Sequence, residues 1–272
     1  MAPIYLVLVF HSVVLLGEYW PTALGLLLAL LLLAGSVAAA VSLVRRIGHS
    51  CKATGNVEAV HVAADRSALQ VEVRLETVWR GHKAGQFAFL DFEDAEGAHP
   101  FTISSAWREN GRITFIIKGL GDYNRRLPDL VEVGQRVIIE GPYGRFDFSG
   151  DAPQLWIGGG VGITPFIARM EDLATRPASG AIDLFYSTAK VQPELVAHLR
   201  ELAAEAGVQF HLVQTPPKPP LSLDMIEGIV RDWRKRDIWF CGPSSFAETV
   251  RARALERGFE PQRFHQELFE MR

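Results

Sequence analysis

Hydrophobic and polar positions follow three different patterns along the chain. Residues 1–44 are almost continuously apolar and carry one charged side chain, Glu18. From about residue 53 to residue 147, apolar and polar residues alternate with a period of two, which is typical of half-buried strands. From residue 154 onward, short apolar runs alternate with stretches of helical periodicity. The pattern predicts a helical N-terminal segment followed by two parts that contain strands.

The N-terminal segment has the length of a membrane-spanning helix. Ala23–Val44 comprises 22 uncharged residues, which as a helix reach about 33 Å, against a hydrocarbon core of about 30 Å. Arg45 and Arg46 follow at once, and by the positive-inside rule they place the rest of the chain in the cytoplasm. We therefore expect a multi-pass protein of the cell (inner) membrane with cytoplasmic domains.

A shorter apolar stretch, Ile4–Leu16, precedes that helix and contains His11. No Lys or Arg occurs before Arg45, so a cleaved signal peptide is disfavoured, and Met1 is expected to lie inside a longer helical bundle. At membrane depth His11 is either an axial haem ligand, the one metal-ligand candidate, or a histidine that bonds to a neighbouring helix. A haem with two histidine ligands needs a second one, and the next histidine is His49.

The middle part predicts an antiparallel barrel, because six short alternating runs are separated by turn residues. The expected strands are Val57–Val62, Leu69–Val78, Gln86–Phe92, His99–Ser105, Ile113–Lys118 and Arg136–Glu140. Asp122–Leu130 is the one stretch there with a helical pattern.

The last part predicts a doubly wound parallel sheet, because strands alternate with helices. The expected strands are Leu155–Ile157, Ile182–Tyr186, Gln209–Val213, Ile238–Cys241 and Arg263–Leu268, and the expected helices are Thr164–Ala174, Pro193–Ala206, Ser222–Arg231 and Ser244–Arg257. The fold class is thus α+β with three regions: residues 1–46 with two transmembrane helices, 50–148 as a barrel and 152–272 as an α/β domain.

Composition excludes several classes of protein. The net charge is −3, from 28 Lys and Arg against 31 Asp and Glu, which argues against a nucleic-acid partner. The two cysteines, Cys51 and Cys241, are far apart in the sequence. A disulfide framework, a CxxC redox pair and a four-cysteine iron–sulfur domain are therefore excluded within this chain.

A glycine-rich turn follows the first strand of the α/β domain. The run Gly158-Gly159-Gly160-Val161-Gly162-Ile163-Thr164-Pro165 opens a helix, where glycines let the backbone approach a pyrophosphate and the helix N-terminus supplies N–H groups. The spacing departs from G-x-G-x-x-G, because Pro165 stands at the third glycine position. On the motif alone, an ordinary strand-to-helix turn remains an alternative.

The end of the second strand of this domain bears on the choice of dinucleotide. An acidic residue there binds the adenosine ribose of NAD, but this chain has Ser187-Thr188-Ala189-Lys190 instead. The lysine favours a 2′-phosphate, and so NADPH over NADH. Lys190 has an equally simple alternative as a solvated surface charge.

Three further motifs are weak singly. Cys241-Gly242-Pro243 ends the fourth strand, where ligands of such sheets bind, although a buried structural cysteine is the alternative. His99-Pro100-Phe101-Thr102 combines an aromatic ring and a hydroxyl on one strand, which suit a flat ring system. Lys118-Gly119-Leu120-Gly121 runs into a short helix through Asn124 and is a second candidate phosphate loop.

Together and in this order, these motifs resemble the ferredoxin–NADP reductase superfamily, and more closely its membrane branch of ferric reductases and NADPH oxidases. The resemblance covers residues 53–272, and more loosely 1–46. Its most specific elements are His99–Thr102, Gly141–Gly144, Gly158–Pro165 and Cys241–Pro243. It implies a barrel that binds FAD and an α/β domain that binds NAD(P)H.

The resemblance also implies roles for single residues. Thr102, Cys241 and Phe269 stand at catalytic positions beside the flavin and the nicotinamide. The FAD contacts that it implies are His99, Pro100, Phe101, Thr102, Lys118, Gly119, Gly121 and Asn124, the last in place of the usual Ser or Thr. The NAD(P)H contacts that it implies are Gly159, Gly160, Val161, Gly162, Thr164, Lys190, Cys241, Gly242 and Pro243.

The expected function is that of a membrane-anchored oxidoreductase, which passes electrons from NAD(P)H through FAD toward haem b and an external acceptor such as ferric iron or oxygen. Its partners would be membrane lipid, the terminal acceptor and missing transmembrane helices or another subunit. Two alternatives remain: an anchored flavodehydrogenase that reduces a partner protein or a quinone without haem, and a regulatory subunit that binds the nucleotide without turnover.

Overall fold

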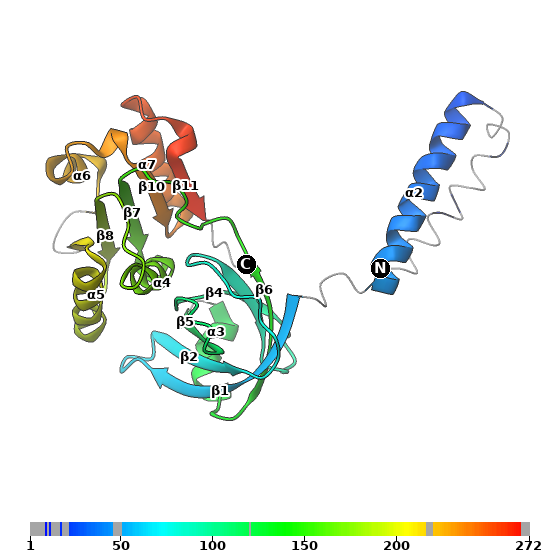
Figure 1. Cartoon of the computed structure of the whole chain (residues 1–272), viewed down its shortest axis with the longest axis horizontal. Coiled ribbons are helices and arrows are strands. Elements are labelled where there is room, and N and C mark those ends of the chain that lie inside the picture. The colour runs from blue at the N-terminus through cyan, green and yellow to red at the C-terminus, as the bar shows by residue number, and fades with distance from the viewer. Residues whose placement is uncertain are drawn as a thin grey trace. The chain divides into compact units, whose positions relative to one another are not determined.

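The computed structural model describes residues 9, 11, 17, 22–45, 51–119, 121–215 and 220–267, with the side chains of 39–45 excepted. The chain divides into two compact units, Met1–Ser50 and Cys51–Arg272 (Figure 1). Because the second unit is compact as a whole, the contacts between its two sheets define one arrangement.

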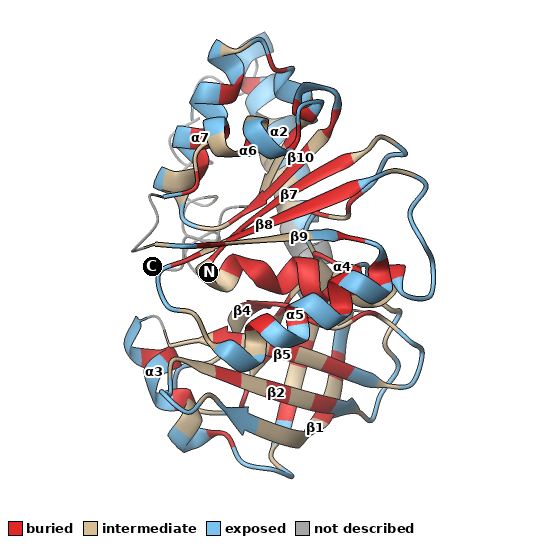
Figure 2. Cartoon of the chain, turned by 90° about the vertical axis from the view of Figure 1, so that its left-hand side faces the viewer, coloured by how far each residue is buried: buried red, intermediate tan, exposed pale blue. Residues whose placement is uncertain are grey.

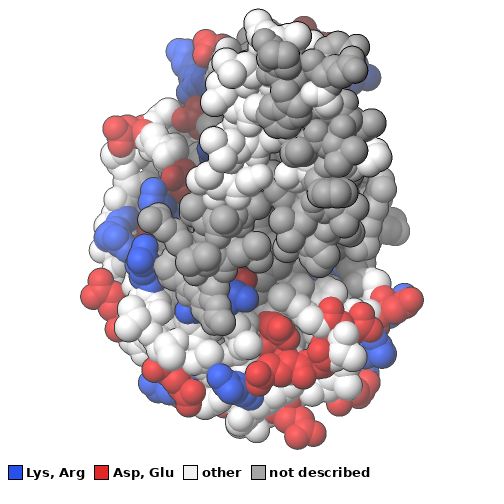
Figure 3. Space-filling model, turned by 90° about the vertical axis from the view of Figure 1, so that its right-hand side faces the viewer, with Lys and Arg blue, Asp and Glu red and all other residues white. Residues whose placement is uncertain are grey.

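The first unit contains helix α2 (Ala23–Arg45), where the sequence predicts a helix. Its described side chains carry no charge, and Figure 3 shows them as a white surface without Lys, Arg, Asp or Glu. Within the described residues, none of the helices combines the length and the apolar character that crossing a membrane requires.

Two transmembrane helices are not found among the described residues, and most of the shorter stretch Ile4–Leu16 lies outside them. The expectation of a multi-pass inner-membrane location is therefore wrong. It rested on an uncharged run of 22 residues.

The first half of the second unit is a near-closed antiparallel barrel in the strand order β4-β3-β6-β1-β2-β5. Its strands are β1 (Lys52–Val62), β2 (Ala68–Leu75), β3 (Phe87–Asp91), β4 (His99–Thr102), β5 (Arg112–Lys118) and β6 (Arg136–Tyr143), and helix α3 (Gly121–Leu130) follows β5. The two edge strands approach each other at an isolated bridge between Ile103 and Phe115. The predicted six-stranded barrel is confirmed.

Alternation of side chains builds the barrel core, as the period-two pattern predicts. In β2 and β5 every second residue is buried, and these residues pack with the inward side chains of β3 and β6. The predicted second strand is too long, however. It ends at Leu75, whose N–H bonds to the carbonyl of Gly111, and Val78 is 88% exposed.

The second half is a parallel sheet in the order β11-β10-β7-β8-β9. Its strands are β7 (Gln154–Gly159), β8 (Ile182–Thr188), β9 (Gln209–Gln214), β10 (Asp237–Cys241) and β11 (Phe264–Glu267), and its helices are α4 (Thr164–Leu173), α5 (Pro193–Ala206), α6 (Leu223–Ile229) and α7 (Ser244–Glu256). Apolar clusters lie on both faces, one with α4 and α5 and the other with α6 and α7. The doubly wound sheet is confirmed.

Burial on both faces explains why these strands read as continuous apolar runs rather than alternating ones. Figure 2 shows β7, β8 and β10 almost wholly buried between the helices. The carboxyl ends of β7 and β10 lie side by side, since Gly158 pairs with Cys241. The glycine turn and the Cys-Gly-Pro segment are brought together in this way.

Contacts from barrel loops hold the two halves of the unit together. The N–H of Ala106, which follows β4, donates to Oε2 of Glu171 in α4 at 2.9 Å. Burial raises the pKa of Glu171. Lys83 reaches Asp147, in the segment that leaves the barrel, at 3.1 Å. The bond from Ala106 to Glu171 joins the barrel directly to a helix of the sheet, and the pair of Lys83 and Asp147 holds the exit segment against the barrel.

Candidate functional site

The glycine turn lies between β7 and α4, at the carboxyl edge of the sheet. A short 3₁₀ turn, Gly160–Ile163, leads into α4, which has Pro165 in its first turn. Gly160 has a φ of +58°, a conformation that suits glycine. The expected strand–turn–helix context of a pyrophosphate-binding turn is present.

Close backbone packing requires glycine at two further positions of this turn. A Cβ on Gly162 would lie 2.1 Å from the carbonyl oxygen of Cys241, and one on Gly159 would lie 3.0 Å from Cδ of Pro243. The turn and the Cys241–Pro243 segment therefore pack against each other without intervening side chains. Gly159, Gly162, Cys241, Gly242 and Pro243, all predicted as nucleotide contacts, are brought together.

Cys241 is a buried packing residue of this junction, and its thiol is not a reactive group. Its side chain is fully buried, and burial, with a further contribution from Glu267, raises the pKa of the thiol. The thiol therefore stays protonated and is a poor nucleophile. Cys241 can contribute shape beside a nicotinamide, while the implied catalytic role stays a prediction.

Glu267 is the last described residue of β11 and connects the sheet to the barrel. It pairs with Cys241 across the strands, and its Oε1 lies 2.9 Å from the position of a Cβ on Gly144, which follows β6. Its Oε2 is buried without a hydrogen-bond partner among the described residues. Burial raises the pKa of Glu267 to about 7.

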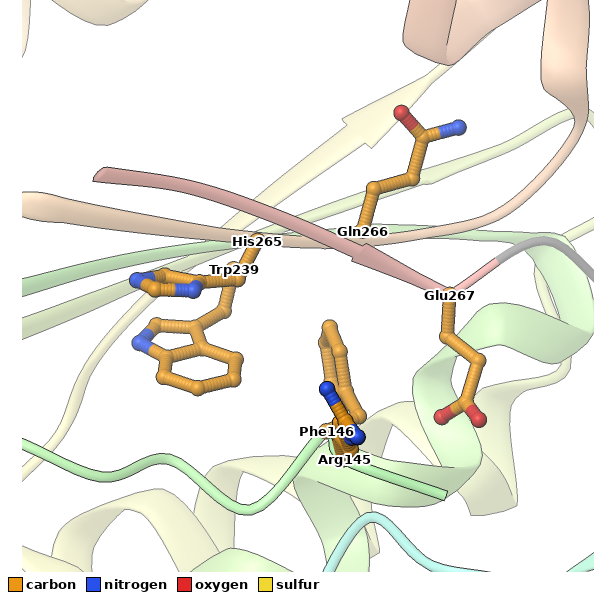
Figure 4. Close-up of a pocket in the computed structure, with 6 residues that line it drawn as sticks. All are labelled: Arg145, Phe146, Trp239, His265, Gln266 and Glu267. Atoms are coloured by element: carbon orange, nitrogen blue, oxygen red, sulfur yellow. The ribbon is translucent and has the colours of Figure 1, made fainter. Parts of the chain in front are cut away.

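A cavity of about 240 Å³ lies beside this carboxyl group, between β10, β11 and the segment that leaves the barrel. Figure 4 shows the ring of His265 over that of Trp239, while Gln266 points to the opposite side of β11 from Glu267. The two stacked rings are 4.0 Å apart. The cavity places a proton-carrying side chain and an aromatic wall at the junction of the two halves.

On the barrel side, four of the predicted flavin contacts lie on β4, and Phe101 and Thr102 are both buried there. Phe101 is 3% exposed and belongs to the barrel core, whereas Thr102 pairs with Phe87 of β3. The ring of His99 stacks on that of Tyr123 in α3 at 4.1 Å. A stacking role of Phe101 on the flavin stays a prediction, because its ring already packs in the core.

The predicted phosphate loop leads into α3. Gly121 has a φ of +76°, and a Cβ on it would meet no atom within 4 Å. Asn124 is buried in the first turns of the helix. Nζ of Lys118 lies 3.5 Å from the position of a Cβ on Gly160, so this ammonium group stands between the two glycine loops.

These residues fit a bound dinucleotide flavin. Nε2 of His99 is buried without a hydrogen-bond partner among the described residues, and His99 stacks on the helix that the phosphate loop opens. A buried polar atom without a partner is costly, and an anionic phosphate would supply one. The space over Gly121 and the charge of Lys118 suit the same group.

Sequence reasoning missed an aromatic cluster on the outer face of the barrel. The rings of Phe87, Phe89 and Tyr143 lie within 6 Å of one another, on half-buried residues next to Gly144. The alternation of β3 carried the signal, because Phe87 and Phe89 occupy positions that would ordinarily be polar. The cluster extends the apolar surface near Glu267.

Lys190 lies apart from the glycine turn, in the loop that follows β8. It pairs with Asp65 from the turn between β1 and β2 at 2.6 Å. Its place at the strand end is the predicted one, but its ammonium group already has a carboxylate partner from the barrel.

His11 and Phe269 are the predicted site residues nearest the two ends of the chain. Phe269 lies outside the described residues. His11 is described as an exposed helical residue. Within the described part of the chain, there is no group of three or more His, Cys, Asp and Glu side chains that could hold a metal ion.

Comparisons with known proteins agree with this geometry. A family model described as an FAD-binding domain matches residues 55–147, which is the barrel with its exit segment. The chain is 28% identical over 207 residues to a glycine betaine monooxygenase reductase subunit of Pseudomonas aeruginosa, covering 69% of this chain and 56% of that protein. It is 26% identical over 195 residues to a toluate 1,2-dioxygenase electron transfer component of Pseudomonas putida, covering 68% and 58%.

The fold of both halves also occurs among solved structures. The flavohem-like FAD/NAD-binding domain of nitric oxide dioxygenase from Vibrio cholerae matches with a TM-score of 0.70 at 19% identity, covering 80% of this chain and 98% of that one. The chain spans less than two thirds of the length of the first relatives it matches. FAD and NAD(P)H are the cofactors that these comparisons support.

Proposed function

We propose that this chain, which carries an FAD-binding domain of the ferredoxin–NADP reductase superfamily, is an NAD(P)H-dependent flavin oxidoreductase that passes electrons to a partner protein. The observation that carries the proposal is the junction at Glu267. There the carboxyl edge of a nucleotide-binding sheet meets the outer face of an FAD-binding barrel, beside Gly144. A hydride donor and a flavin need such a meeting place, because their rings must be held face to face.

On the barrel side, the chain would hold and orient FAD. When bound, FAD accepts a hydride from the nicotinamide and releases electrons one at a time. The loop from Lys118 to Gly121 and the first turn of α3 offer N–H groups and an ammonium to the pyrophosphate. The implied contact between Thr102 and the flavin edge remains part of this proposal.

On the sheet side, the chain would position NAD(P)H. The glycine turn from Gly159 to Thr164 offers backbone N–H groups to the pyrophosphate, and Cys241–Pro243 walls the end of the sheet. The buried thiol of Cys241 excludes water without reacting. The pKa of Glu267 is near neutrality, so its carboxyl group can hold or release a proton at Oε2, beside the place proposed for the flavin and nicotinamide rings.

The electron acceptor in this proposal is a protein of an oxygenase system. The names of two relatives support it, since one is a monooxygenase reductase subunit and the other a dioxygenase electron transfer component. The alternative of an electron relay through haem at His11 to ferric iron or oxygen rests on sequence alone. The exposed His11 adds no support to that alternative.

Anaerobic flavin reduction tests the proposal. The full chain, reconstituted with FAD, is mixed with NADH or NADPH, and we expect the flavin absorbance near 450 nm to bleach. Added ferricyanide should then restore it. A folded chain that retains no FAD, or whose flavin neither nucleotide reduces, would contradict the function and favour the regulatory alternative.

A further inference from the structure

The segment that follows β8 has no carboxylate of its own, but a carboxylate from the barrel lies beside it. Residues Tyr186 to Gln192, which end β8 and lead to α5, contain no Asp or Glu. Oδ2 of Asp65, in the turn between β1 and β2, lies 2.6 Å from Nζ of Lys190. Figures 1 and 2 both show this hairpin approaching α5.

The position of Asp65 is fixed by several hydrogen bonds. Its Oδ1 accepts from the hydroxyl of Ser67 at 2.6 Å and from the N–H of Ser67 at 3.1 Å. Nε2 of Gln192 donates to Oγ of Ser67 at 2.7 Å and approaches Oδ1 of Asp65 at 3.4 Å. The side chains of both domains are thus tied together at this point.

The same contacts keep Asp65 ionised and orient Lys190. Hydrogen bonds from Lys190 and Ser67 hold the pKa of Asp65 well below its usual range. The N–H of Lys190 donates to Oγ1 of Thr188 at 3.3 Å, and this hydroxyl donates to the carbonyl of Lys190 at 3.0 Å. The ammonium group of Lys190, whose side chain is 72% exposed, therefore has a fixed negative charge beside it at the protein surface.

We propose that Asp65 sets the choice of dinucleotide in favour of NADH, by neutralising Lys190 and placing a carboxylate where the adenosine ribose binds. This inference rests on the proposed function. In sheets of this kind the adenosine ribose lies beyond the end of the second strand, here β8, where a carboxylate accepts hydrogen bonds from the ribose hydroxyls. In this chain the carboxylate comes from the other domain.

A 2′-phosphate would be disfavoured at this site for a simple electrostatic reason. It carries a charge of roughly −1.5 to −2 at neutral pH, and it would meet Asp65 while Lys190 is already paired. NADH carries no such group, and its two ribose hydroxyls can donate to the carboxylate. The expectation of NADPH, drawn from a strand end with two hydroxyls and a lysine but no acid, is opposed by this inference, because the sequence does not show that Asp65 lies beside Lys190.

Equilibrium binding to the FAD-loaded full chain tests this inference without turnover. Calorimetric titrations with NAD⁺, NADP⁺ and adenosine 2′,5′-bisphosphate compare the wild type with Asp65→Asn. We expect the wild type to bind NAD⁺ more tightly than NADP⁺, and Asp65→Asn to shift the affinity ratio toward NADP⁺ on the order of tenfold. Adenosine 2′,5′-bisphosphate should gain affinity in the same variant.

Two further variants separate a local role from a general charge effect. Asp65→Asn combined with Lys190→Ala should lose the gain for NADP⁺, because the released ammonium group is then absent. Asp129→Asn removes another exposed carboxylate, paired with Arg66 of the same turn, and should leave the ratio unchanged. Equal shifts in both single variants would overturn the local role of Asp65.

The outcomes distinguish this inference from the proposed function. If NADH reduces the flavin but Asp65→Asn leaves the binding ratio unchanged, the inference is wrong and the function stands. A wild-type preference for NADP⁺ also overturns it. If NAD⁺ binds preferentially through Asp65 but neither reduced nucleotide bleaches the flavin, the function fails and the inference stands.

Discussion

At the scale of single residues, the carboxyl group of Glu267 has an unusually high pKa. Burial in the junction raises its pKa to about 7, from 4.5. The protonated form is favoured in the folded state, so the group's stabilising effect is complete below pH 4.5 and is lost as the pH rises through 7. The contribution of Glu267 to the free energy of unfolding should therefore decrease as the pH rises from 4.5 to 7.

Replacing Glu267 with Gln should remove that component. We expect the free energy of unfolding of the wild type to fall relative to Glu267→Gln by up to about 3 kcal/mol between pH 4.5 and pH 8. Urea titrations at several pH values measure this difference. Glu256→Gln, at an exposed position of α7, is the control and should show no such trend. A pH-independent difference for Glu267→Gln would refute the assignment.

Thr102 is the second residue whose role can be tested directly, through its hydroxyl group. If it contacts the flavin edge, Thr102→Ala should weaken FAD binding or slow flavin reduction roughly fivefold, since a lost hydrogen bond to a bound ring costs about 1 kcal/mol. FAD retention and stopped-flow reduction measure both effects. Thr249→Ala, on the exposed face of α7, serves as the matched control. Unchanged retention and unchanged reduction would exclude the role.

At the scale of elements, the glycine turn depends on close backbone contact. In Gly162→Ala the new Cβ would lie 2.1 Å from the carbonyl oxygen of Cys241. Backbone must shift, and we expect a loss of roughly 2 kcal/mol in stability together with weaker nucleotide binding. Thermal unfolding and calorimetric titration with NAD⁺ check this expectation.

Gly228→Ala provides the matched control for that substitution. A Cβ on Gly228, in α6, would meet no atom within 4 Å. Alanine should stabilise the helix by about 0.5–1 kcal/mol, because glycine is a poor helix former. A similar destabilisation in both variants would show that contact with Cys241 is not the cause in Gly162→Ala.

The opposite edge of the parallel sheet depends on a buried ion pair. Arg236, which is 7% exposed, donates from Nη1 to Oδ2 of Asp183 at 2.7 Å. Nε2 of His211 lies 2.7 Å from the other oxygen of Asp183. Burial opposes ionisation of Asp183, but the contacts with His211 and Arg236 hold its pKa below the ordinary value. The network connects the starts of β8, β9 and β10.

Asp183→Asn should destabilise the chain by about 3 kcal/mol near neutral pH, because Arg236 would keep its charge without its buried partner. Since the pKa of Asp183 is lowered, its contribution is present above its unfolded pKa and is lost as the pH falls through the folded value. Asp232→Asn, at the exposed partner of the same arginine, should cost less than 1 kcal/mol. Urea unfolding compares the two, and equal losses would contradict a buried ion pair.

At the scale of the whole molecule, electron transfer requires a fixed arrangement of barrel and sheet. The hydrogen bond from Ala106 to Glu171 is one of the contacts that fixes it. Glu171→Ala leaves the N–H of Ala106 without its acceptor and should cost about 1–3 kcal/mol in stability.

Flavin reduction in Glu171→Ala should slow severalfold while FAD content stays constant, because the two rings are then held less firmly. Stopped-flow absorbance with a parallel FAD assay separates these effects. Thr175→Ala, at an exposed position just after α4, is the control that should leave the rate unchanged. Loss of FAD from Glu171→Ala would place its effect in the barrel instead of in the arrangement.

The sequence alone determined most of the fold and part of the candidate site. Period-two alternation fixed the inward residues of the barrel, and apolar runs between helical stretches fixed the buried strands of the sheet, because burial depends on side-chain type at regular spacing. The turn with its φ of +58° at Gly160 was predictable for a similar reason, since few residues other than glycine adopt that backbone conformation.

Only the tertiary structure decided which side chains from distant segments meet. It paired Lys190 with Asp65 from another domain, placed Glu267 beside Gly144, and turned Phe101 into the barrel core. It also corrected the membrane location inferred from an uncharged run. Local patterns report a residue's preferred surroundings, but a carboxylate's partner and pKa depend on charges and burial supplied by residues far away in the chain.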